Sequence, residues 1–153
     1  MMDTFDTVEA VLDFAVRREQ ETVEFYENLA GRTDNLQLKK ALTAFAGVEK
    51  GHKKKLLAAK EAGLAVGEPG GRVVDLKIGD YLVEVDAGPE MSFQDALVVA
   101  MKREKAAMEL YADMASRISN AELKAMFEKL AREEAGHKLS FETAYEEHFM
   151  QDN

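Results

Sequence analysis

The sequence predicts an all-α protein, a four-helix bundle in which two antiparallel helix hairpins are copies of each other and are joined by a long crossover connector. Three observations predict this fold class. Four long segments repeat apolar residues at intervals of three and four, the middle joint between them is long while the outer two are short, and the first half of the chain aligns with the second without gaps. The 153 residues suit a single domain with its own core.

The first predicted hairpin has helices over about 7–31 and 35–62. Both segments carry an apolar stripe at helical spacing. The letters GRTDN at 31–35 combine a helix-ending glycine with residues that favour a helix N-cap, so we expect a tight turn there. Gly63 follows the second helix and suits the left-handed conformation that ends many helices. Helices joined by such a short turn pack antiparallel.

The second predicted hairpin has helices over about 92–118 and 121–148. Ser92 and Asp95 resemble a capping box at its start, with aspartate in place of the usual glutamate. The letters SN at 119–120 form the turn and the next N-cap. These two helices are therefore expected to pack antiparallel as well.

The connector at 63–91 differs in composition from the helices, because it holds both prolines and six of the ten glycines. Its pieces VVDLKI and YLVEV are rich in β-branched residues and partly alternate, so short strands are expected there. At roughly 3.3 Å per extended residue, the connector can run the length of a helix. The second and third helices are then parallel, which is the topology of ferritin-like bundles.

Composition narrows the function classes. The absence of cysteine excludes disulfides, thiolate metal sites, iron–sulfur clusters and a cysteine nucleophile. The net charge of −9 argues against nucleic acid and anionic membranes as partners. The N-terminal residues lack the basic and apolar regions of a signal peptide, and no run of about 18 apolar residues occurs. We therefore expect a cytoplasmic protein without a membrane span.

An internal repeat relates the two hairpins. Residues 15–57 align with residues 100–142 at an offset of 85, and fifteen of the 43 aligned pairs are identical. This match indicates duplication of one hairpin and predicts a pseudo-twofold axis through the bundle. Residues near that axis would lie close to their own counterparts.

Six polar residues interrupt the apolar faces of the predicted helices, about midway along each. The motifs VEKGH at 48–52 and EEAGH at 133–137 each place a glutamate three residues before a histidine, so both side chains share one helix face. A further glutamate lies on the apolar face of the first helix and of the third. The six residues are Glu19, Glu49, His52, Glu104, Glu134 and His137.

Four inward carboxylates would repel one another and take up protons unless positive charge compensates them. Two divalent cations supply that charge, because four glutamates contribute −4, two cations contribute +4 and neutral imidazoles contribute nothing. One glutamate from each of two helices, with a Glu-x-x-His unit from each of the other two, is a known dinuclear ligand pattern. The sequence therefore predicts a site for two metal ions, with a metal-free helical scaffold as the competing interpretation.

The chain resembles the rubrerythrin-type members of the ferritin-like di-iron superfamily. The resemblance rests on the two Glu-x-x-His motifs together with REQETVEFY at 18–26 and REKAAMELY at 103–111, and it covers nearly the whole chain. It implies two non-haem iron ions, for which Mn or Zn can substitute. By position in the motifs, it implies terminal ligands at Glu19 and Glu104, bridging ligands at Glu49 and Glu134, and one histidine on each metal, His52 and His137.

Two features depart from that family. Rubrerythrins proper end in a cysteine-ligated rubredoxin-like domain that relays electrons, whereas this sequence has no cysteine and stops after the fourth predicted helix. A separate electron-donor protein is therefore expected if the site turns over. Rubrerythrins also have an extra glutamate near the position of Glu104, linked to peroxide chemistry, where this chain has Met101 and Ala107 on the same face.

From the resemblance we expect a non-haem di-iron protein that reacts with O2 or peroxide, either as a ferroxidase or as an oxidant-scavenging peroxidase. The alternative is iron sequestration or metal binding without sustained turnover. We expect a homo-oligomer, with a dimer favouring redox work and a larger shell favouring storage.

Two tyrosines also occupy equivalent positions of the repeat. Tyr26 and Tyr111 each follow a predicted ligand, Glu19 or Glu104, by seven residues. At 1.5 Å of rise per residue they lie about 10 Å along the helix from those glutamates. Three roles remain open for them: hydrogen-bond donors beside the ligands, radical or electron-relay residues, or core tyrosines that reach a polar partner.

Overall fold

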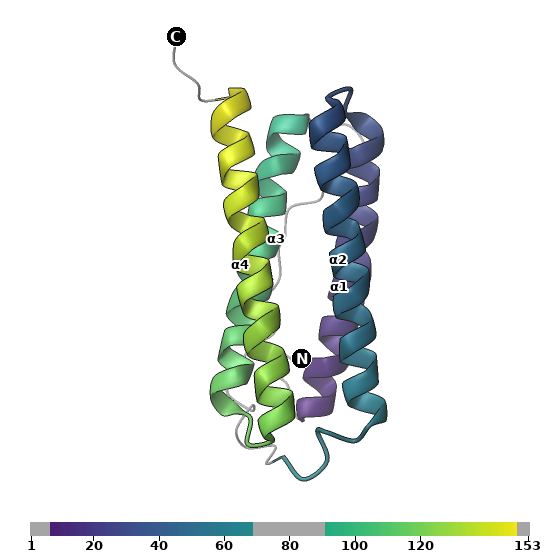
Figure 1. Cartoon of the computed structure of the whole chain (residues 1–153), viewed down its shortest axis with the longest axis vertical. Coiled ribbons are helices and arrows are strands. Elements are labelled where there is room, and N and C mark those ends of the chain that lie inside the picture. The colour runs from purple at the N-terminus through teal and green to yellow at the C-terminus, as the bar shows by residue number, and fades with distance from the viewer. Residues whose placement is uncertain (1–6, 69–90, 150–153) are drawn as a thin grey trace.

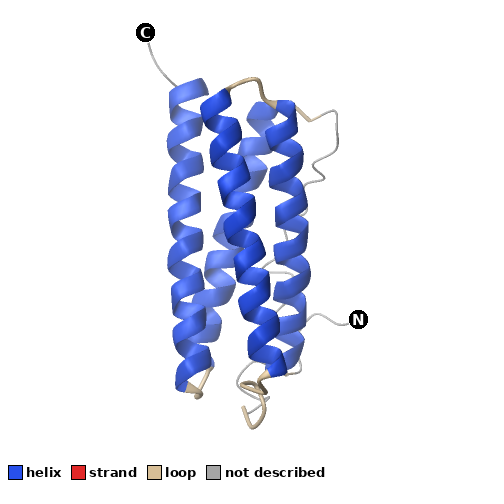
Figure 2. Ribbon diagram, turned by 45° about the vertical axis from the view of Figure 1, so that its right-hand side comes forward, coloured by secondary structure: helices blue, strands red, loops and turns tan. Residues whose placement is uncertain are grey.

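The computed structural model describes residues 7–68 and 91–149 and contains four α-helices there. They are α1 (Val8–Arg32), α2 (Leu36–Glu61), α3 (Phe93–Arg117) and α4 (Ala121–Phe149). Each helix begins and ends within one residue of its predicted range. Figure 2 shows that helices dominate the described chain, in which no strand occurs. The two expected strands, in VVDLKI and YLVEV, lie outside the described residues.

The four helices form the predicted bundle of two antiparallel hairpins (Figure 1). In that view α1 runs upward, α2 and α3 both run downward, and α4 runs upward again. Packing is closest within each hairpin, while α1 lies beside α3 and α2 lies beside α4 across the bundle. The parallel α2 and α3 give the ferritin-like topology, so the predicted fold class is confirmed. No stretch able to span a membrane occurs among the described helices.

Polar side chains cap the start of every helix. Each accepts a hydrogen bond from the backbone N–H three residues later, at 2.9–3.1 Å. The four N-cap residues are Thr7, Asn35, Ser92 and Asn120. Each such cap stabilises its helix by about 1 kcal/mol, because it satisfies a backbone donor that has no partner within the helix.

Side chains also fix the two ends of the crossover. Glu68, after α2, accepts hydrogen bonds from the backbone N–H groups of Ser119 at 2.8 Å and Asn120 at 2.7 Å, in the turn between α3 and α4. Arg32, at the end of α1, donates a hydrogen bond to the backbone carbonyl of Met91, just before α3. The two ends of the crossover therefore lie at opposite ends of the bundle, as parallel α2 and α3 require.

The apolar core is divided into two clusters. One contains Leu12 and Phe127, and the other contains Leu42 and Phe141. Along each helix the two clusters are separated by roughly two to three turns, and apart from Ala106 the buried residues in that gap are charged or polar. The bundle is thus apolar at both ends of its interior and polar in a middle layer.

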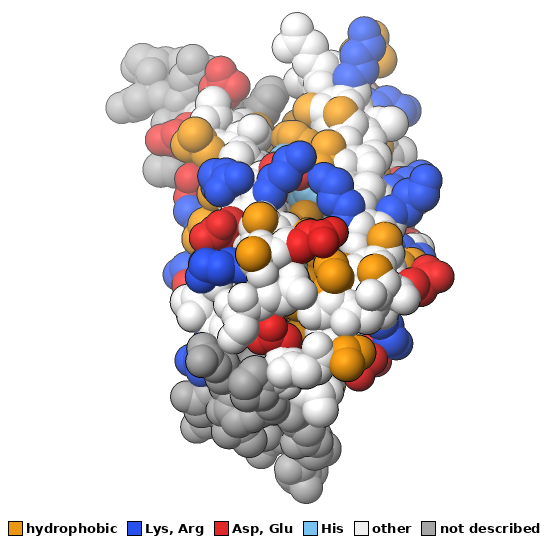
Figure 3. All heavy atoms as spheres, turned by 60° about the horizontal axis from the view of Figure 1, so that its bottom comes forward, with side chains coloured by type: hydrophobic (Ala, Val, Ile, Leu, Met, Phe, Trp, Pro, Cys, Tyr) orange, Lys and Arg blue, Asp and Glu red, His pale blue; other side chains and the backbone are white. Residues whose placement is uncertain are grey.

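The outer surface is unlike this middle layer. Figure 3 shows basic, acidic and apolar side chains interspersed over one face of the molecule. Mixed charges in water interact weakly and cost little. Acidic groups enclosed between two apolar clusters have no such solvent, so the polar layer is the part of the fold that needs a separate explanation.

Candidate metal centre

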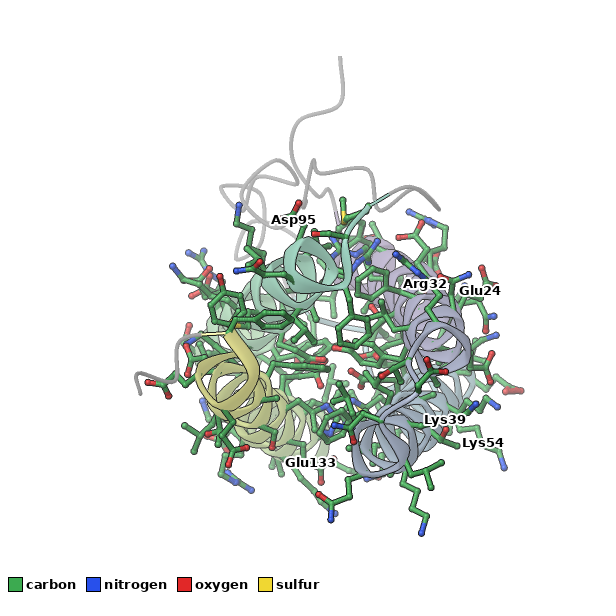
Figure 4. All side chains as sticks on the ribbon, turned by 90° about the horizontal axis from the view of Figure 1, so that it is seen from above. Glu24, Arg32, Lys39, Lys54, Asp95 and Glu133 are labelled. Atoms are coloured by element: carbon green, nitrogen blue, oxygen red, sulfur yellow. The ribbon has the colours of Figure 1, made fainter. Side chains whose placement is uncertain are left out.

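The polar layer contains all six residues that the sequence singled out, and all of them are buried. Their exposed fractions are Glu19 2%, Glu49 0%, His52 1%, Glu104 1%, Glu134 1% and His137 8%. Figure 4 looks down the bundle and shows side chains from all four helices filling the space between the ribbons. The structure therefore brings the six residues together from four helices.

Helix geometry explains how each side chain reaches the layer. Glu19 on α1 and Glu104 on α3 are equivalent in the repeat, and each is flanked on its helix by core residues one turn away. On α2, the spacing of three between Glu49 and His52 places both on the face that carries Leu56. α4 repeats the same spacing with its own glutamate and histidine. The duplication thus delivers two matching half-sites.

The potential ligand atoms form two overlapping groups. In each group, one oxygen or nitrogen atom per residue lies within 4.8 Å of the others. The His52 group comprises Glu19, Glu49, His52 and Glu134, and the His137 group comprises Glu49, Glu104, Glu134 and His137. Glu49 and Glu134 belong to both groups. Shared carboxylates of this kind are what two neighbouring ions require.

In the His52 group, the imidazole turns its Nδ1 atom toward the carboxylates. Nδ1 of His52 lies 2.8 Å from Oε1 of Glu49. It lies 3.5 Å from Oε2 of Glu19 and 3.7 Å from Oε1 of Glu134. Nδ1 is therefore the nitrogen that this histidine offers to the centre.

The His137 group has a similar but more even geometry. Nδ1 of His137 lies 3.5 Å from Oε1 of Glu134. It lies 3.6 Å from Oε2 of Glu49 and 3.6 Å from Oε2 of Glu104. Both histidines thus direct the same ring nitrogen into the layer, as expected for side chains related by the repeat.

The layer contains polar atoms that the described residues leave without hydrogen bonds. Seven buried atoms of the six residues make no hydrogen bond of good geometry there, although His52 Nδ1 and Glu49 Oε1 lie 2.8 Å apart. They are Glu19 Oε1, Glu49 Oε1 and Oε2, His52 Nδ1, Glu104 Oε1, Glu134 Oε1 and His137 Nδ1. A buried polar group without a partner costs about 1–3 kcal/mol. Carboxylate oxygens and imidazole nitrogens are ligands for divalent iron, manganese and zinc. The orphaned atoms therefore fit a metal centre.

Burial and mutual repulsion shift the carboxyl groups toward their neutral forms. Burial raises the pKa of Glu19 to about 8 and that of Glu104 to about 7. The pKa of Glu134 is raised well above its ordinary value, by burial first and then by the charges of the other glutamates. In the absence of other cations, protons thus supply much of the compensating charge.

The imidazoles shift in the opposite sense to the one burial favours. Burial alone would lower the pKa of His52, but the close carboxylates of Glu19 and Glu49 outweigh it and raise the pKa to about 10. Burial is likewise outweighed at His137, where Glu104 and Glu49 raise the pKa to about 9. For Glu49, burial raises the pKa but the two imidazoles lower it below its usual range. The negative charges of the buried carboxylates are therefore balanced only when the layer also holds protons or other cations.

The two repeated tyrosines contact the layer from opposite hairpins. Tyr26 on α1 donates a hydrogen bond to Oε2 of Glu104 on α3, and Tyr111 on α3 donates one to Oε2 of Glu19 on α1 at 2.5 Å. Burial raises the pKa of both hydroxyls, and the nearby carboxylates raise it further, so both stay protonated donors. Each tyrosine therefore fixes one carboxylate oxygen of the other hairpin.

Two further residues touch the histidines and were not among the predicted site residues. Oε1 of Glu133 lies 2.6 Å from Nε2 of His52, on the side of the ring opposite Nδ1. The ring of Phe45 packs against His137 with 4.4 Å between ring centroids. Neither contact could be predicted from the repeat, because the repeat aligns Glu133 with Val48 and Phe45 with Leu130, so neither residue is duplicated.

The fold and the polar layer together define the class of protein, a ferritin-like four-helix bundle with a buried carboxylate and histidine centre. The Rubrerythrin family model matches residues 95–153, which include nearly all of α3 and all of α4. That range holds three of the six layer residues, Glu104, Glu134 and His137. The rubrerythrin-type resemblance indicated by the sequence motifs is therefore confirmed.

A solved structure supports the fold over nearly the whole chain. It is a protein from Thermotoga maritima described as a ferritin-like diiron-carboxylate protein, with a TM-score of 0.75 and 20% sequence identity. The match covers 94% of this chain and 97% of that one. At such low identity the likeness establishes the shared fold. No curated protein matches the sequence significantly.

Proposed function

We propose that this chain is a non-haem di-iron protein that reacts with O2 or peroxide. The observation that carries the proposal is the pair of overlapping ligand groups, in which Glu49 and Glu134 are shared. Two shared carboxylates, two outer carboxylates and two imidazoles balance the charge of two divalent ions. The family match over 95–153 and the di-iron description of the T. maritima protein favour iron over other divalent metals.

Each residue of the layer has a distinct task in this proposal. Glu49 and Glu134 would bridge the two ions, while Glu19 with His52 would hold one ion and Glu104 with His137 the other. Bound Fe(II) would supply the electrons that reduce the oxidant. The protein's own contribution is to fix the ligands in a buried layer between two apolar clusters, where charge interactions are stronger than in water.

Tyr26 and Tyr111 would position the outer ligands. Each hydroxyl occupies one carboxylate oxygen of Glu104 or Glu19, which leaves the other oxygen for an ion. Hydrogen bonds of this kind orient ligands and tune a metal. Of the three roles open for these tyrosines, this geometry favours hydrogen-bond donation to the ligands. For sustained turnover, the proposal includes a separate electron-donor protein.

The test is anaerobic loading with Fe(II), removal of unbound metal, and then rapid mixing with O2 or H2O2. The proposal predicts two irons per chain and a fast absorbance change that reports oxidation. Tens of irons per chain would instead support storage in an assembled shell, and size-exclusion chromatography of the same sample would detect that shell. A chain that retains no iron after loading would contradict the proposal. The metal-free helical scaffold would then be the remaining interpretation.

A further inference from the structure

The two halves of the layer carry different residues at the position just before each Glu-x-x-His unit, although the repeat makes these positions equivalent. An offset of 85 aligns Glu133 on α4 with Val48 on α2. Each of these residues directly precedes the glutamate of a Glu-x-x-His unit. One half therefore carries a carboxylate where the other carries an aliphatic side chain with no polar atom.

The carboxylate of Glu133 contacts the histidine of the opposite hairpin. Its Oε1 atom lies 2.6 Å from Nε2 of His52, which links α4 to α2. The side chain of His52 is 1% exposed, whereas that of Glu133 is 34% exposed. Figure 4 labels Glu133 at the edge of α4 that faces α2. The contact thus joins the buried imidazole to the rim of the bundle, outside the ring of ligands.

This contact determines which nitrogen of His52 faces the centre. An ionised carboxylate can only accept a hydrogen bond, so Nε2 of His52 must carry the proton and donate it. In the neutral imidazole, Nδ1 then has the free lone pair, and Nδ1 is the atom directed at Glu19, Glu49 and Glu134. A carboxylate behind a metal-binding imidazole fixes the tautomer and ring orientation and raises the basicity of the ligand.

The other histidine is held by different means. Val48, at the position equivalent to Glu133, cannot accept a hydrogen bond from His137. The ring of His137 instead packs against Phe45, 4.4 Å between centroids, at a position where the other half has Leu130. Packing restrains the ring plane but does not select the tautomer or add basicity. The two imidazoles are therefore unequal as ligands even though their Nδ1 atoms are similarly placed.

We propose that Glu133 is a positioning residue that makes the two metal positions unequal, so that the position formed by the His52 group fills first and holds its ion more tightly. This inference rests on the proposed dinuclear site and concerns the order and affinity of loading. Loss of such a carboxylate typically weakens metal binding by about 10–100-fold. Among the residues that the structure describes, no carboxylate is found in a comparable contact with Nε2 of His137.

The variants follow from the repeat. Glu133→Val gives the second half the residue found in the first, and Glu133→Gln keeps the size and an acceptor oxygen but removes the charge. Val48→Glu makes the reciprocal change. Glu128→Val is the matched control, since Glu128 is an exposed carboxylate of α4 and its loss changes the net charge equally. Circular dichroism checks that each variant folds.

Co(II) titration of the metal-free protein is the first measurement, because its visible absorption reports each ion and it avoids redox chemistry. Wild type and Glu128→Val are expected to bind two ions in two steps. Glu133→Val should weaken the tighter step by about 10–100-fold, with Glu133→Gln in between. Val48→Glu should tighten the weaker step. An unchanged tight step in Glu133→Val, or equal steps in wild type, would overturn the inference while leaving the two-metal site in place.

Nitrogen-15 NMR of the Zn(II)-loaded protein is the second measurement. The ring proton on Nε2 of His52 should be shifted downfield and exchange slowly, and both properties should be lost in Glu133→Val but kept in Glu128→Val. An identical His52 signal in Glu133→Val and wild type would contradict the positioning role. A wild-type protein that binds neither Co(II) nor Zn(II) would refute this inference and the proposed function together.

Discussion

The two hairpins of this bundle agree at the ligand positions and differ in what lies behind them. Both supply an outer glutamate, a shared glutamate and a histidine, and both send a tyrosine across to the other hairpin. Behind the histidines, Glu133 stands opposite Val48 and Phe45 opposite Leu130. The residues common to both halves are those that the proposed two-ion site would need, and the residues behind the histidines are where the two halves differ.

The polar layer also differs from the apolar clusters above and below it. Each cluster is stabilised by burial of hydrocarbon, at roughly 25 cal/mol for each Å² removed from water. The layer buries polar groups instead of hydrocarbon, so it contributes less of this stabilising free energy. It also leaves seven polar atoms without hydrogen bonds of good geometry. This contrast supports the proposal that the layer binds metal ions, which would compensate the buried acidic groups.

The largest effect is expected from the shared ligands. Glu49→Ala or Glu134→Ala removes a residue common to both groups, and each should abolish binding of two ions. Metal analysis after anaerobic Fe(II) loading measures this, with Glu24→Ala as the exposed control on α1. Two irons per chain in Glu49→Ala would refute its bridging role.

Variants of the outer ligands, Glu19 and Glu104, test the two metal positions one at a time. Glu19→Ala removes a ligand from the His52 group alone, and Glu104→Ala removes one from the His137 group alone. Each variant should therefore keep one ion of the pair, and loss in Glu19→Ala should affect the tighter position. Co(II) titration distinguishes the two results. Loss of both ions in each variant would show that the halves cannot bind independently.

The metal-free layer predicts a pH dependence of stability with a definite sign. The folded-state pKa values of Glu19 (about 8) and Glu104 (about 7) exceed the ordinary 4.5, and those of His52 (about 10) and His137 (about 9) exceed 6.5. The folded state therefore binds more protons than the unfolded state between about pH 5 and 9, so its free energy of unfolding should fall as the pH rises.

Urea unfolding of the metal-free protein at pH 5, 7 and 9 measures this slope. Glu49 stays ionised throughout that window, because its pKa is lowered. Metal binding should release the protons held by the layer, and calorimetry in buffers of different ionisation enthalpy would detect them. If the free energy of unfolding of the metal-free protein instead rose from pH 5 to pH 9, the folded state could not bind more protons than the unfolded state, and the prediction would be wrong.

Variants of the two tyrosines test whether the hydrogen bonds between the hairpins stabilise the folded protein. Tyr26→Phe and Tyr111→Phe each leave a buried carboxylate oxygen without its donor, at a cost of about 1–3 kcal/mol. The two losses should be similar, since the contacts are related by the repeat. Urea unfolding compares them with Tyr145→Phe, whose hydroxyl accepts a hydrogen bond from exposed Gln94. Equal stability of all three variants would show that the cross-hairpin contacts contribute nothing.

The smallest effect is expected at two repeated glycines. Gly51 and Gly136 lie inside α2 and α4, and a Cβ atom added at either would meet no atom within 4 Å among the described surroundings. Gly51→Ala and Gly136→Ala should each stabilise the bundle by about 1 kcal/mol, because glycine is a poor helix former. Thermal unfolding measures both. Destabilisation by either would indicate a close contact with another molecule at that face.

Much of this structure was predictable because it depends on local patterns. Apolar spacing and N-cap residues such as Asn35 and Ser92 set the helices to within one residue. The repeat identified the six layer residues, since duplicated glutamates and histidines on apolar faces are conspicuous. The same repeat indicated Tyr26 and Tyr111, although their hydrogen bonds to the opposite hairpin become evident only in the folded structure.

The contact between Glu133 and His52 was not predictable from the sequence. It joins residues 81 positions apart on different hairpins, and its acceptor lies outside the set of residues that the repeat preserves. A half-exposed glutamate in a chain with 29 acidic residues carries no distinguishing pattern. Such asymmetries arise from packing between the hairpins, which spacing within one helix cannot report.

The most direct test of the central claim is anomalous X-ray scattering at the iron edge, on crystals of protein loaded anaerobically with Fe(II). We predict two peaks inside the polar layer, one beside Glu19 and His52 and the other beside Glu104 and His137, with Glu49 and Glu134 reaching both. A single peak, or peaks only on the outer surface, would contradict a shared two-ion site.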